Sequence, residues 1–575
     1  MRKTKHVAMV LMAALVLPMQ AQKKSEIRLN QVGYYADEEK VVVIDGKNPG
    51  SSLSVTDAQG NVVLRPKVVR KALSPWSKKQ RFIVDVSELR TPGQYTIATK
   101  DDKACINVGS RVLHDVAVAS LKMFYLMRTG TPILKPYAAE YARPAGHPDT
   151  HVLVHPSAAS INRPAGSVIS SPLGWYDAGD YNKYVVNSSF SIGVMLTCYE
   201  QNKDYFARLD TNIPESRNAT PDLLDEMMFN LRWLLTMQDP ADGGVYHKLT
   251  TPNFEGFVMP ADCHQPRYVV AKSVTATLDF AAVMAQSARL LKDSRDYSEF
   301  APMAEAAALK AWQWAEANPD AYYRQELLSQ QHQPAIYTGT YGDGNARDER
   351  FWAATELFRL TGNDAFLQAA RQAMPERFTA PTWGGLASLG ALSWIASSQQ
   401  EMKQLMLGQL KDYCDELIGR VPTSSFQSPF GNKASDFGWG CLAEGCCVNG
   451  VALLFADKYI EKGKYFRHAL QNADYLLGRN ATGYCFVTGF GTKSPMHPHH
   501  RPSEADGIDN PFPGMLVGGP NPGQQDKESG HLTYPSNLPD ESYIDDMGSY
   551  ASNEIAINWN ASLVALLCWI DALKG

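Results

Sequence analysis

Two aspartates three positions apart carry the first candidate chemistry of the chain. Asp177 and Asp180 lie in the stretch GWYDAGDYNKYVV, residues 174–186, among aromatic and apolar side chains. Because Asp competes with the backbone for hydrogen bonds and Gly costs conformational entropy, the stretch predicts a loop rather than a helix or a strand. A capped turn between helices and a pair of catalytic carboxylates both fit this stretch, and on its own it does not separate them.

A third carboxylate, Glu554, lies near the C-terminus in YIDDMGSYASNEIAINWNAS, residues 543–562. The apolar stripe that follows predicts that Glu554 begins the last helix, where the helix dipole would stabilise a capping acid. The same stretch holds further acids and aromatic residues: Tyr543, Asp545, Asp546, Tyr550 and Trp559. Aromatic faces bind sugar rings, and paired carboxylic acids cleave glycosidic bonds, so the stretch is a candidate sugar site.

A histidine-rich loop precedes this stretch. It reads FVTGFGTKSPMHPHHRPS, residues 486–503, and contains His497, His499, His500 and Arg501. The histidine spacing does not match a helical zinc pair, and Pro498 interrupts the local geometry. We therefore favour substrate contacts over metal ligation for this loop.

Composition excludes several classes of protein. The 575 residues carry 55 basic and 60 acidic side chains, for a net charge of −5, and 44% of them are hydrophobic. This is a globular chain with a large core, and it lacks the basic clusters that would indicate a nucleic-acid partner. Nine cysteines are too few for a disulfide scaffold, and the odd number leaves at least one unpaired in a monomer.

The N-terminus predicts export. Basic residues at the start, an apolar run from Val7 to Leu17 and a small-residue cleavage point near Ala21 define a signal peptide over residues 1–22. That run is too short for a membrane span, and no later apolar stretch is long enough. We expect a protein with no membrane span, in the periplasm or the extracellular medium.

Two kinds of secondary structure must position these residues. Residues 23–108 contain short β-branched or alternating runs separated by turn signals, which predicts a small β-sandwich. After that, apolar residues repeat at intervals of three and four in about a dozen segments, including helices near 113–128 and 188–200. Helices paired in a closed ring would gather their long loops on the rims, and we expect the site on one rim.

Three segments, in order, resemble glycoside hydrolase family 9, the inverting endo-β-1,4-glucanases, in the subgroup with an N-terminal immunoglobulin-like domain. WYDAGDYNKYVVN is similar to the DAGD segment of that family, the histidine loop and the C-terminal stretch to its two signatures, and IRLNQVGYY with the PGQY turn to the sandwich. The resemblance covers essentially the whole mature chain. It implies an immunoglobulin-like β-sandwich at 23–108, an all-α (α/α)6 barrel at 109–575, and a β-glucan polysaccharide or oligosaccharide as substrate.

The resemblance also implies roles for single residues. Asp180 would be the general base that activates a water, Asp177 would help to hold that water, and Glu554 would be the general acid that protonates the leaving oxygen. We place Asp545 and His499 with these catalytic residues, and Arg501, Trp559 and Tyr550 with the substrate-binding residues. A general acid needs a raised pKa, which we expect Glu554 to receive from apolar surroundings and from Asp545 and Asp546, against the opposing helix dipole.

No cofactor is required for this chemistry. Family members sometimes bind zinc through a Cys/His group before the DAGD loop, but here Gly146 replaces an expected cysteine, although His147 remains. The sequence therefore disfavours zinc. Calcium occurs in several members, and YGDGNARDE, with Asp343 and Asp348, offers oxygen ligands without a recognisable calcium loop, so a structural calcium stays open.

Two alternatives remain beside the endoglucanase. One is an exo-acting or branched-glucan hydrolase of the same fold, acting on xyloglucan or a glucosamine polymer, because the fold and the acids do not fix the sugar subsites. The other is an inactive glycan-binding relative, which the three intact acids argue against. We expect a monomer in which the sandwich buttresses the barrel.

Overall fold

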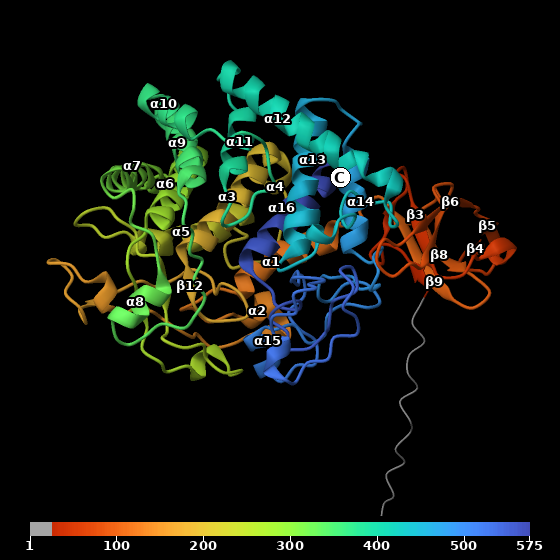
Figure 1. Cartoon of the computed structure of the whole chain (residues 1–575), viewed down its shortest axis with the longest axis horizontal. Helices are drawn as coiled ribbons and strands as arrows, with labels where there is room; N and C mark the ends of the chain where they lie inside the picture. Colours follow the sequence, from red (N-terminus) through yellow and green to blue (C-terminus); the bar gives the residue numbers. More distant parts are fainter. Residues whose placement is uncertain (1–25) are drawn as a thin grey trace, which may run out of the picture.

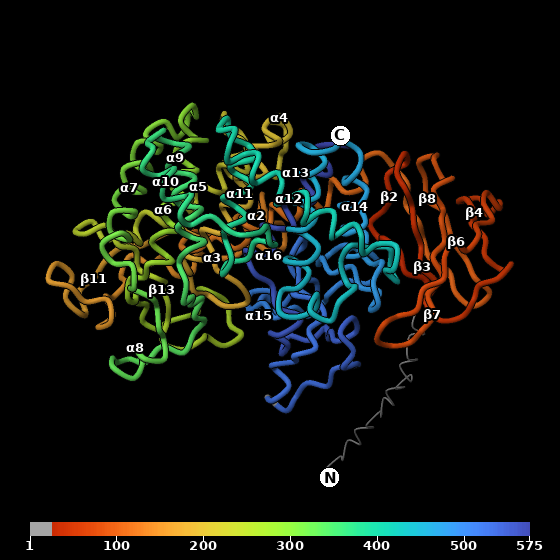
Figure 2. Tube along the Cα trace, turned by 45° about the horizontal axis from the view of Figure 1, so that its top comes forward, coloured from red at the N-terminus to blue at the C-terminus, as the bar shows by residue number. Residues whose placement is uncertain are grey.

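The computed structural model describes residues 26–575, so the predicted signal peptide lies outside the described residues. The chain forms a small β-sandwich beside a large helical domain (Figures 1 and 2). The last sandwich strand ends at Gly109 and the first helix begins at His114. The predicted fold class, a β-sandwich followed by an all-α domain, is confirmed.

The sandwich consists of two sheets, ordered β1-β3-β7-β6 and β2-β9-β8-β4-β5, in which all strand pairs but β2 with β9 are antiparallel. Its strands are β1 (Ile27–Arg28), β2 (Tyr34–Tyr35), β3 (Val41–Asp45), β4 (Ser54–Thr56), β5 (Val62–Leu64), β6 (Val68–Leu73), β7 (Gln80–Asp85), β8 (Gly93–Ala98) and β9 (Lys103–Gly109). Inward-facing β-branched residues such as Val42, Val84 and Ile97 are fully buried between the sheets and form the core.

The helical domain closes on itself. Packing contacts run from α3 through α6, α9, α11, α12, α13 and α16 and back to α3, as expected for the (α/α)6 barrel. The helices are α1 (His114–Leu126), α2 (Lys135–Ala138), α3 (Val185–Gln201), α4 (Lys203–Phe206), α5 (Asp222–Met237), α6 (Val274–Leu291), α7 (Phe300–Ala317), α8 (Gln325–Gln331), α9 (Arg347–Thr361), α10 (Asp364–Ala373), α11 (Ala387–Ile395), α12 (Gln400–Gly419), α13 (Val448–Tyr459), α14 (Phe466–Leu476), α15 (Arg501–Ala505) and α16 (Ile557–Lys574).

One element of the helical domain was not predicted. Five short strands form a sheet in the order β11-β10-β14-β13-β12. They are β10 (Val152–Val154), β11 (Val168–Ile169), β12 (Lys183–Tyr184), β13 (Lys248–Thr250) and β14 (Tyr268–Val269). Strands of two or three residues are too short to show an alternating pattern, so the sequence contained no sign of strands in these segments. The sheet matters because β12 follows the Asp loop directly and ties it to β13.

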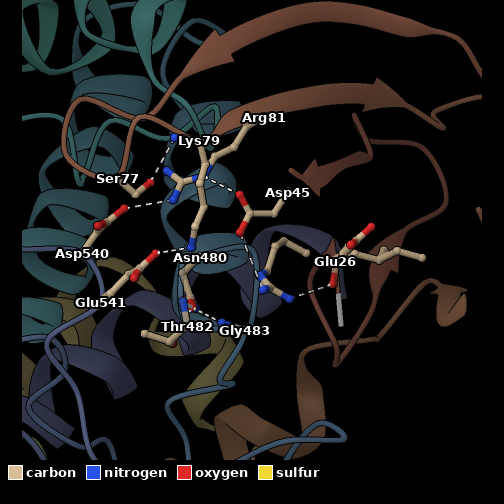
Figure 3. Close-up of polar contacts among 12 residues, drawn as sticks. Glu26, Asp45, Ser77, Lys79, Arg81, Asn480, Thr482, Gly483, Asp540 and Glu541 are labelled. Atoms are coloured by element: carbon tan, nitrogen blue, oxygen red, sulfur yellow. Dashed lines mark hydrogen bonds and ion pairs between the residues drawn. The ribbon is translucent and has the colours of Figure 1, made fainter. Parts of the chain in front are cut away.

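Buried charges join the sandwich to the barrel. Arg81 of β7 is fully buried. It donates from Nη2 to Asp540 Oδ2 at 3.1 Å, and its Nε lies 3.4 Å from Asp45 Oδ1 (Figure 3). Its Nη1 donates to Ser425 Oγ at 2.8 Å. Such contacts are worth most where water is excluded, and removing one partner leaves an unpaired buried charge. This buried junction agrees with the predicted buttressing role.

All nine cysteines are free thiols, and seven of them are buried. Within residues 26–575, the chain has no helix with the length and apolar character needed to cross a membrane.

Candidate active site

The Asp loop is a buried, irregular segment between two anchor points. An isolated bridge pairs Ala178 with Ala556, just before α16, and β12 pairs with β13 behind the loop. Asp177 is 2% exposed and Asp180 5% exposed, so neither carboxylate is a solvated turn residue. The burial of two adjacent acids favours the catalytic interpretation of this loop over the capped turn.

Asp177 is held by two donors. Asn187 of α3 donates from Nδ2 to Oδ1 at 2.7 Å, and the Tyr341 hydroxyl donates to Oδ2 at 2.7 Å. Burial, and then the nearby charge of Asp180, raise the pKa of Asp177, while these two hydrogen bonds lower it. With both oxygens engaged, Asp177 is fixed in place.

Asp180 is held on one side only. Asn182 Nδ2 at 2.6 Å and the Tyr184 hydroxyl at 3.0 Å both donate to Oδ2. Oδ1 has no protein hydrogen-bond partner among residues 26–575, which leaves it available to a water. A carboxylate with one fixed and one open oxygen is suited to accept a proton from water in a defined direction.

Glu554 does not begin a helix, contrary to the prediction. It lies in an extended segment that bridges to His499, and α16 starts three residues later at Ile557. The Gly179 amide donates to Glu554 Oε1 at 3.3 Å, which brings Glu554 next to Asp180. The extended conformation arises because the Glu554 carbonyl accepts the Gly518 amide at 3.0 Å and Ala556 pairs with the Asp loop.

The pKa of Glu554 is raised well above its usual value, first by burial and then by Asp180 and Asp177, with Arg501 opposing. The direction agrees with the prediction, but its electrostatic source does not, because the Asp loop and not Asp545 or Asp546 supplies the charge. A carboxyl kept protonated in this way is suited to act as a general acid.

Gly179 permits this close approach. A Cβ added at Gly179 would lie 2.2 Å from the His499 carbonyl oxygen and 3.1 Å from Glu554 Oε1. Its own carbonyl accepts from the Arg501 amide at 3.2 Å and from Arg501 Nη1 at 2.7 Å. Only glycine fits at the junction of the three predicted segments.

The histidine loop joins the same site. The His499 amide donates to the Asn553 carbonyl at 2.9 Å, and its Nδ1 lies 2.6 Å from the Met547 carbonyl. Burial lowers the pKa of His499 to about 4, so the ring is neutral at ordinary pH. Arg501 is 7% exposed and, besides Gly179, donates from Nε to the Glu255 carbonyl at 2.8 Å.

Asp545 has its oxygens occupied by the chain. It accepts the Met496 amide at 2.9 Å, the His497 amide at 3.0 Å and Asn553 Nδ2 at 3.1 Å. This carboxylate fixes the histidine loop against the C-terminal stretch. The contacts indicate a positioning role for Asp545, which the sequence placed with the catalytic residues.

Aromatic side chains lie around the acids. Tyr550 is 36% exposed, with its ring 6.1 Å from His499 and 5.6 Å from the exposed Trp439. Phe254 is exposed above the Arg501 guanidinium at 5.6 Å. Trp559, at 6% exposure, is buried against Gly440 and Gly518, so Tyr550 is far more accessible to a ligand than Trp559.

Several partners of the acids were not singled out from the sequence. Tyr184 and Asn187 were visible four and seven residues after Asp180, where the loop ends and the helix begins. Tyr341 lies about 160 residues away in the chain, in the YGDGNARDE loop, where only acids were considered. No sequence signal marks that long-range contact.

Two candidate metal groups follow from the predictions. A cysteine at position 146 does not fit, because a Cβ there would lie 2.4 Å from Pro260 Cβ, so the chain does not provide the Cys/His zinc group before the DAGD loop. For calcium, Asp279 and Glu349 are fully buried, and none of their carboxylate oxygens has a hydrogen-bond partner among the described residues. The pKa of each is raised, first by burial and then by other carboxylates, including Asp348.

A small immunoglobulin-like domain, a closed helical barrel, and two buried aspartates with a partly buried glutamate beside exposed aromatic rings define a glycoside hydrolase. The family model described as Glycosyl hydrolase family 9 matches residues 114–567, and the one described as Cellulase N-terminal ig-like domain matches residues 22–104. The chain belongs to glycosyl hydrolase family 9.

Known proteins agree with this assignment. A xyloglucan-specific endo-beta-1,4-glucanase of Bacteroides ovatus, BoGH9A, is 53% identical over 95% of this chain and 94% of its own length. Endoglucanase D of Acetivibrio thermocellus is 31% identical over 95% of this chain and 83% of its own length.

Solved structures agree as well. The structure titled Bacteroides ovatus GH9 superposes with a TM-score of 0.91 at 51% identity and covers 96% of this chain and 99% of its own. A variant of the thermostable endoglucanase of Alicyclobacillus acidocaldarius gives 0.84 at 29% identity over 95% and 99%. The chain is a glycoside hydrolase of the endo-β-1,4-glucanase class, as the sequence predicted.

Proposed function

We propose that this enzyme cleaves the β-1,4-glucan backbone of xyloglucan internally and with inversion at the anomeric carbon. The observation that carries the choice of xyloglucan is the 53% identity, over nearly the full length of both chains, to a protein named for that specificity. The inverting chemistry rests on the arrangement of the three acids.

In the proposed mechanism, a water hydrogen-bonds to the open Oδ1 of Asp180 and attacks the anomeric carbon. Asp180 takes the proton of the water, while Glu554 gives its proton to the departing glycosidic oxygen. One oxygen–carbon bond forms on the face opposite the one that breaks, so the anomeric configuration inverts. Asp177, fixed by Asn187 and Tyr341, orients the attacking water.

The surroundings of the two acids support the proposed direction of proton transfer. Glu554 has a strongly raised pKa and is the proton donor. Asp180 is the proposed base, because Asn182 and Tyr184 hold its Oδ2 and leave Oδ1 open to the water. After turnover Asp180 is protonated and Glu554 ionised, and exchange with solvent restores both.

The exposed aromatic side chains support a polysaccharide substrate. Tyr550 and Trp439 form one platform beside His499, and Phe254 forms another beside Arg501. Rings of this kind stack on the apolar faces of pyranose units, and we propose that they hold the backbone while leaving its branches in solvent.

The substrate is tested by comparing kcat/KM on xyloglucan, on an unbranched soluble β-1,4-glucan and on a chitosan-type polymer. We expect xyloglucan to be preferred at least tenfold, with viscosity falling before reducing sugar accumulates. Equal or better cleavage of the unbranched glucan would overturn the xyloglucan assignment. Sugar release that precedes the viscosity drop would indicate exo action.

We also propose a structural calcium held by the buried acids Asp279 and Glu349 and the partly buried Asp348, since an unneutralised group of buried carboxylates is costly. The oxygens of Asp279 and Glu349 that lack partners support this.

In addition, we propose an exported monomer. N-terminal sequencing of the mature protein tests export, and light scattering tests the monomeric state.

A further inference from the structure

Three potential metal ligands meet behind the active site. His147, Glu255 and Cys263 each offer one ligand atom, and these atoms all lie within 4.8 Å of one another. His147 precedes β10. Glu255 and Cys263 lie five and thirteen residues after the end of β13, in the loop of residues 251–267 that leads to β14. The cluster therefore connects two segments that are about a hundred residues apart in the chain.

Two of the three ligand atoms have no partner. Nε2 of His147 and Oε1 of Glu255 are buried, and neither has a hydrogen-bond partner among residues 26–575. A buried carboxylate oxygen or ring nitrogen without a partner costs free energy, and native proteins rarely tolerate it. Both atoms belong to the same cluster of three side chains, which favours a bound ligand such as a metal ion as their common partner.

The His147 ring is already oriented for ligation. Its Nδ1 lies 2.9 Å from the Tyr176 hydroxyl, and its ring packs against Tyr176 and Tyr181. A metal-bound histidine commonly uses its other ring nitrogen in such a hydrogen bond, which fixes the tautomer and the direction of the ligating nitrogen. Burial lowers the pKa of His147 to about 2, so the ring is neutral and Nε2 can carry a lone pair.

The donor set selects the kind of cation. One thiolate, one imidazole and one carboxylate suit a borderline-soft divalent ion, and their two negative charges would balance it. Burial raises the pKa of the Cys263 thiol to about 12, so the thiol is protonated until a cation displaces its proton. Tetrahedral zinc ligands lie roughly 3.5 Å apart, so the three side chains need only close slightly from their present separation.

We infer that His147, Glu255 and Cys263 form a zinc-type metal site that fastens the 251–267 loop to the scaffold beneath the Asp loop. A water would complete the tetrahedron. This donor set differs from the Cys/His group that the sequence disfavoured, because position 146 offers no ligand and two of the three donors come from a different loop.

The fastened loop reaches the active site. The Glu255 carbonyl accepts from Arg501 Nε at 2.8 Å. The Val258 carbonyl accepts at 2.6 Å from the hydroxyl of Tyr181, the residue that follows Asp180. The ring of Phe257 packs edge-on against His499 at 5.4 Å. A metal at this point would hold the position of the loop that supports Arg501 and His499, and would take no part in the proton transfers.

The test measures zinc binding directly. Protein stripped with a chelator is dialysed against buffered Zn²⁺, and bound metal is counted by mass spectrometry. We expect one Zn²⁺ per chain in the wild type, a loss of at least about tenfold in affinity for Cys263→Ser and Glu255→Gln, and no change for Cys105→Ser. Cys105 is the matched control because it is the one exposed free cysteine of the described residues.

A second measurement covers the case in which a ligand variant fails to fold. In Cys105→Ser, Cys263 is the remaining cysteine that is not buried, so it is the thiol that reacts with a thiol reagent in the native protein. We expect Zn²⁺ to protect it and Co²⁺ to give a thiolate-to-cobalt charge-transfer band. Sub-stoichiometric zinc unaffected by Cys263→Ser, or a Cys263 thiol that reacts equally with and without Zn²⁺, would overturn the site.

Discussion

The hydroxyl of Tyr341 provides the sharpest test of how the buried acids are tuned. It donates to Asp177 Oδ2 at 2.7 Å, and this hydrogen bond lowers the pKa of Asp177 against the opposing effect of burial. Tyr341→Phe removes the donor but keeps the ring, which packs against Tyr184 and Trp383. The same hydroxyl also accepts from Asn187 Nδ2 at 3.1 Å, so the substitution removes the two hydrogen bonds of one hydroxyl and keeps the ring in place.

The size of the effect follows from that hydrogen bond. A hydrogen bond to a charged group contributes about 1.5–3 kcal/mol, and 1.36 kcal/mol corresponds to one pKa unit. Losing the donor should raise the pKa of Asp177 by about 1–2 units. Because we propose that ionised Asp177 orients the attacking water, the acidic limb of the kcat/KM profile should move to higher pH by that amount, while the alkaline limb stays in place.

The assay is a pH profile of kcat/KM on soluble xyloglucan, measured by reducing ends. Tyr205→Phe is the matched control, because the Tyr205 hydroxyl also donates to a buried carboxylate, Asp571 at 2.8 Å, but far from the acids of the site. An unmoved acidic limb in folded Tyr341→Phe, or an equal shift in the control, would refute the proposed tuning.

Further variants test the remaining assignments. Glu554→Gln should lower kcat about 10²- to 10⁴-fold and abolish the alkaline limb, as expected for loss of the proton donor; a retained limb would contradict the assignment. Asp545→Asn should lower kcat/KM without moving either limb, because Asp545 holds the histidine loop, and a shifted limb would instead show direct proton transfer. Arg81→Met should destabilise the protein by about 3–5 kcal/mol in urea, and the exposed-pair variant Lys79→Met by less than about 1 kcal/mol; equal effects would contradict the importance of the buried junction. Added Ca²⁺ should raise the Tm of the wild type but not of Asp279→Asn, and no response in the wild type would exclude the calcium proposal.

Local patterns in the sequence were sufficient for the architecture. The three- and four-residue spacing of apolar residues predicted helices near 113–128 and 188–200, where α1 and α3 lie. The signatures around Asp180, His499 and Glu554 likewise predicted that three distant segments form one site, and the Gly179 contacts join them. Both kinds of signal are contained in short stretches of chain.

The errors came from contacts between distant segments. An apolar stripe predicted a helix from Glu554, but pairing with His499 and with the Asp loop keeps that residue extended. The charge that raises its pKa comes from Asp180, more than 370 residues away in the chain, and not from its sequence neighbours. Tyr341 could not be found for the same reason, since no local pattern encodes which loop closes over Asp177.

The stereochemistry of the first product tests the central claim most directly. An NMR time course on soluble xyloglucan, begun before mutarotation, should show the α-anomer appearing first, because water held by Asp180 attacks opposite the bond that Glu554 protonates. Early release of the β-anomer would contradict inversion and with it the roles assigned to both acids.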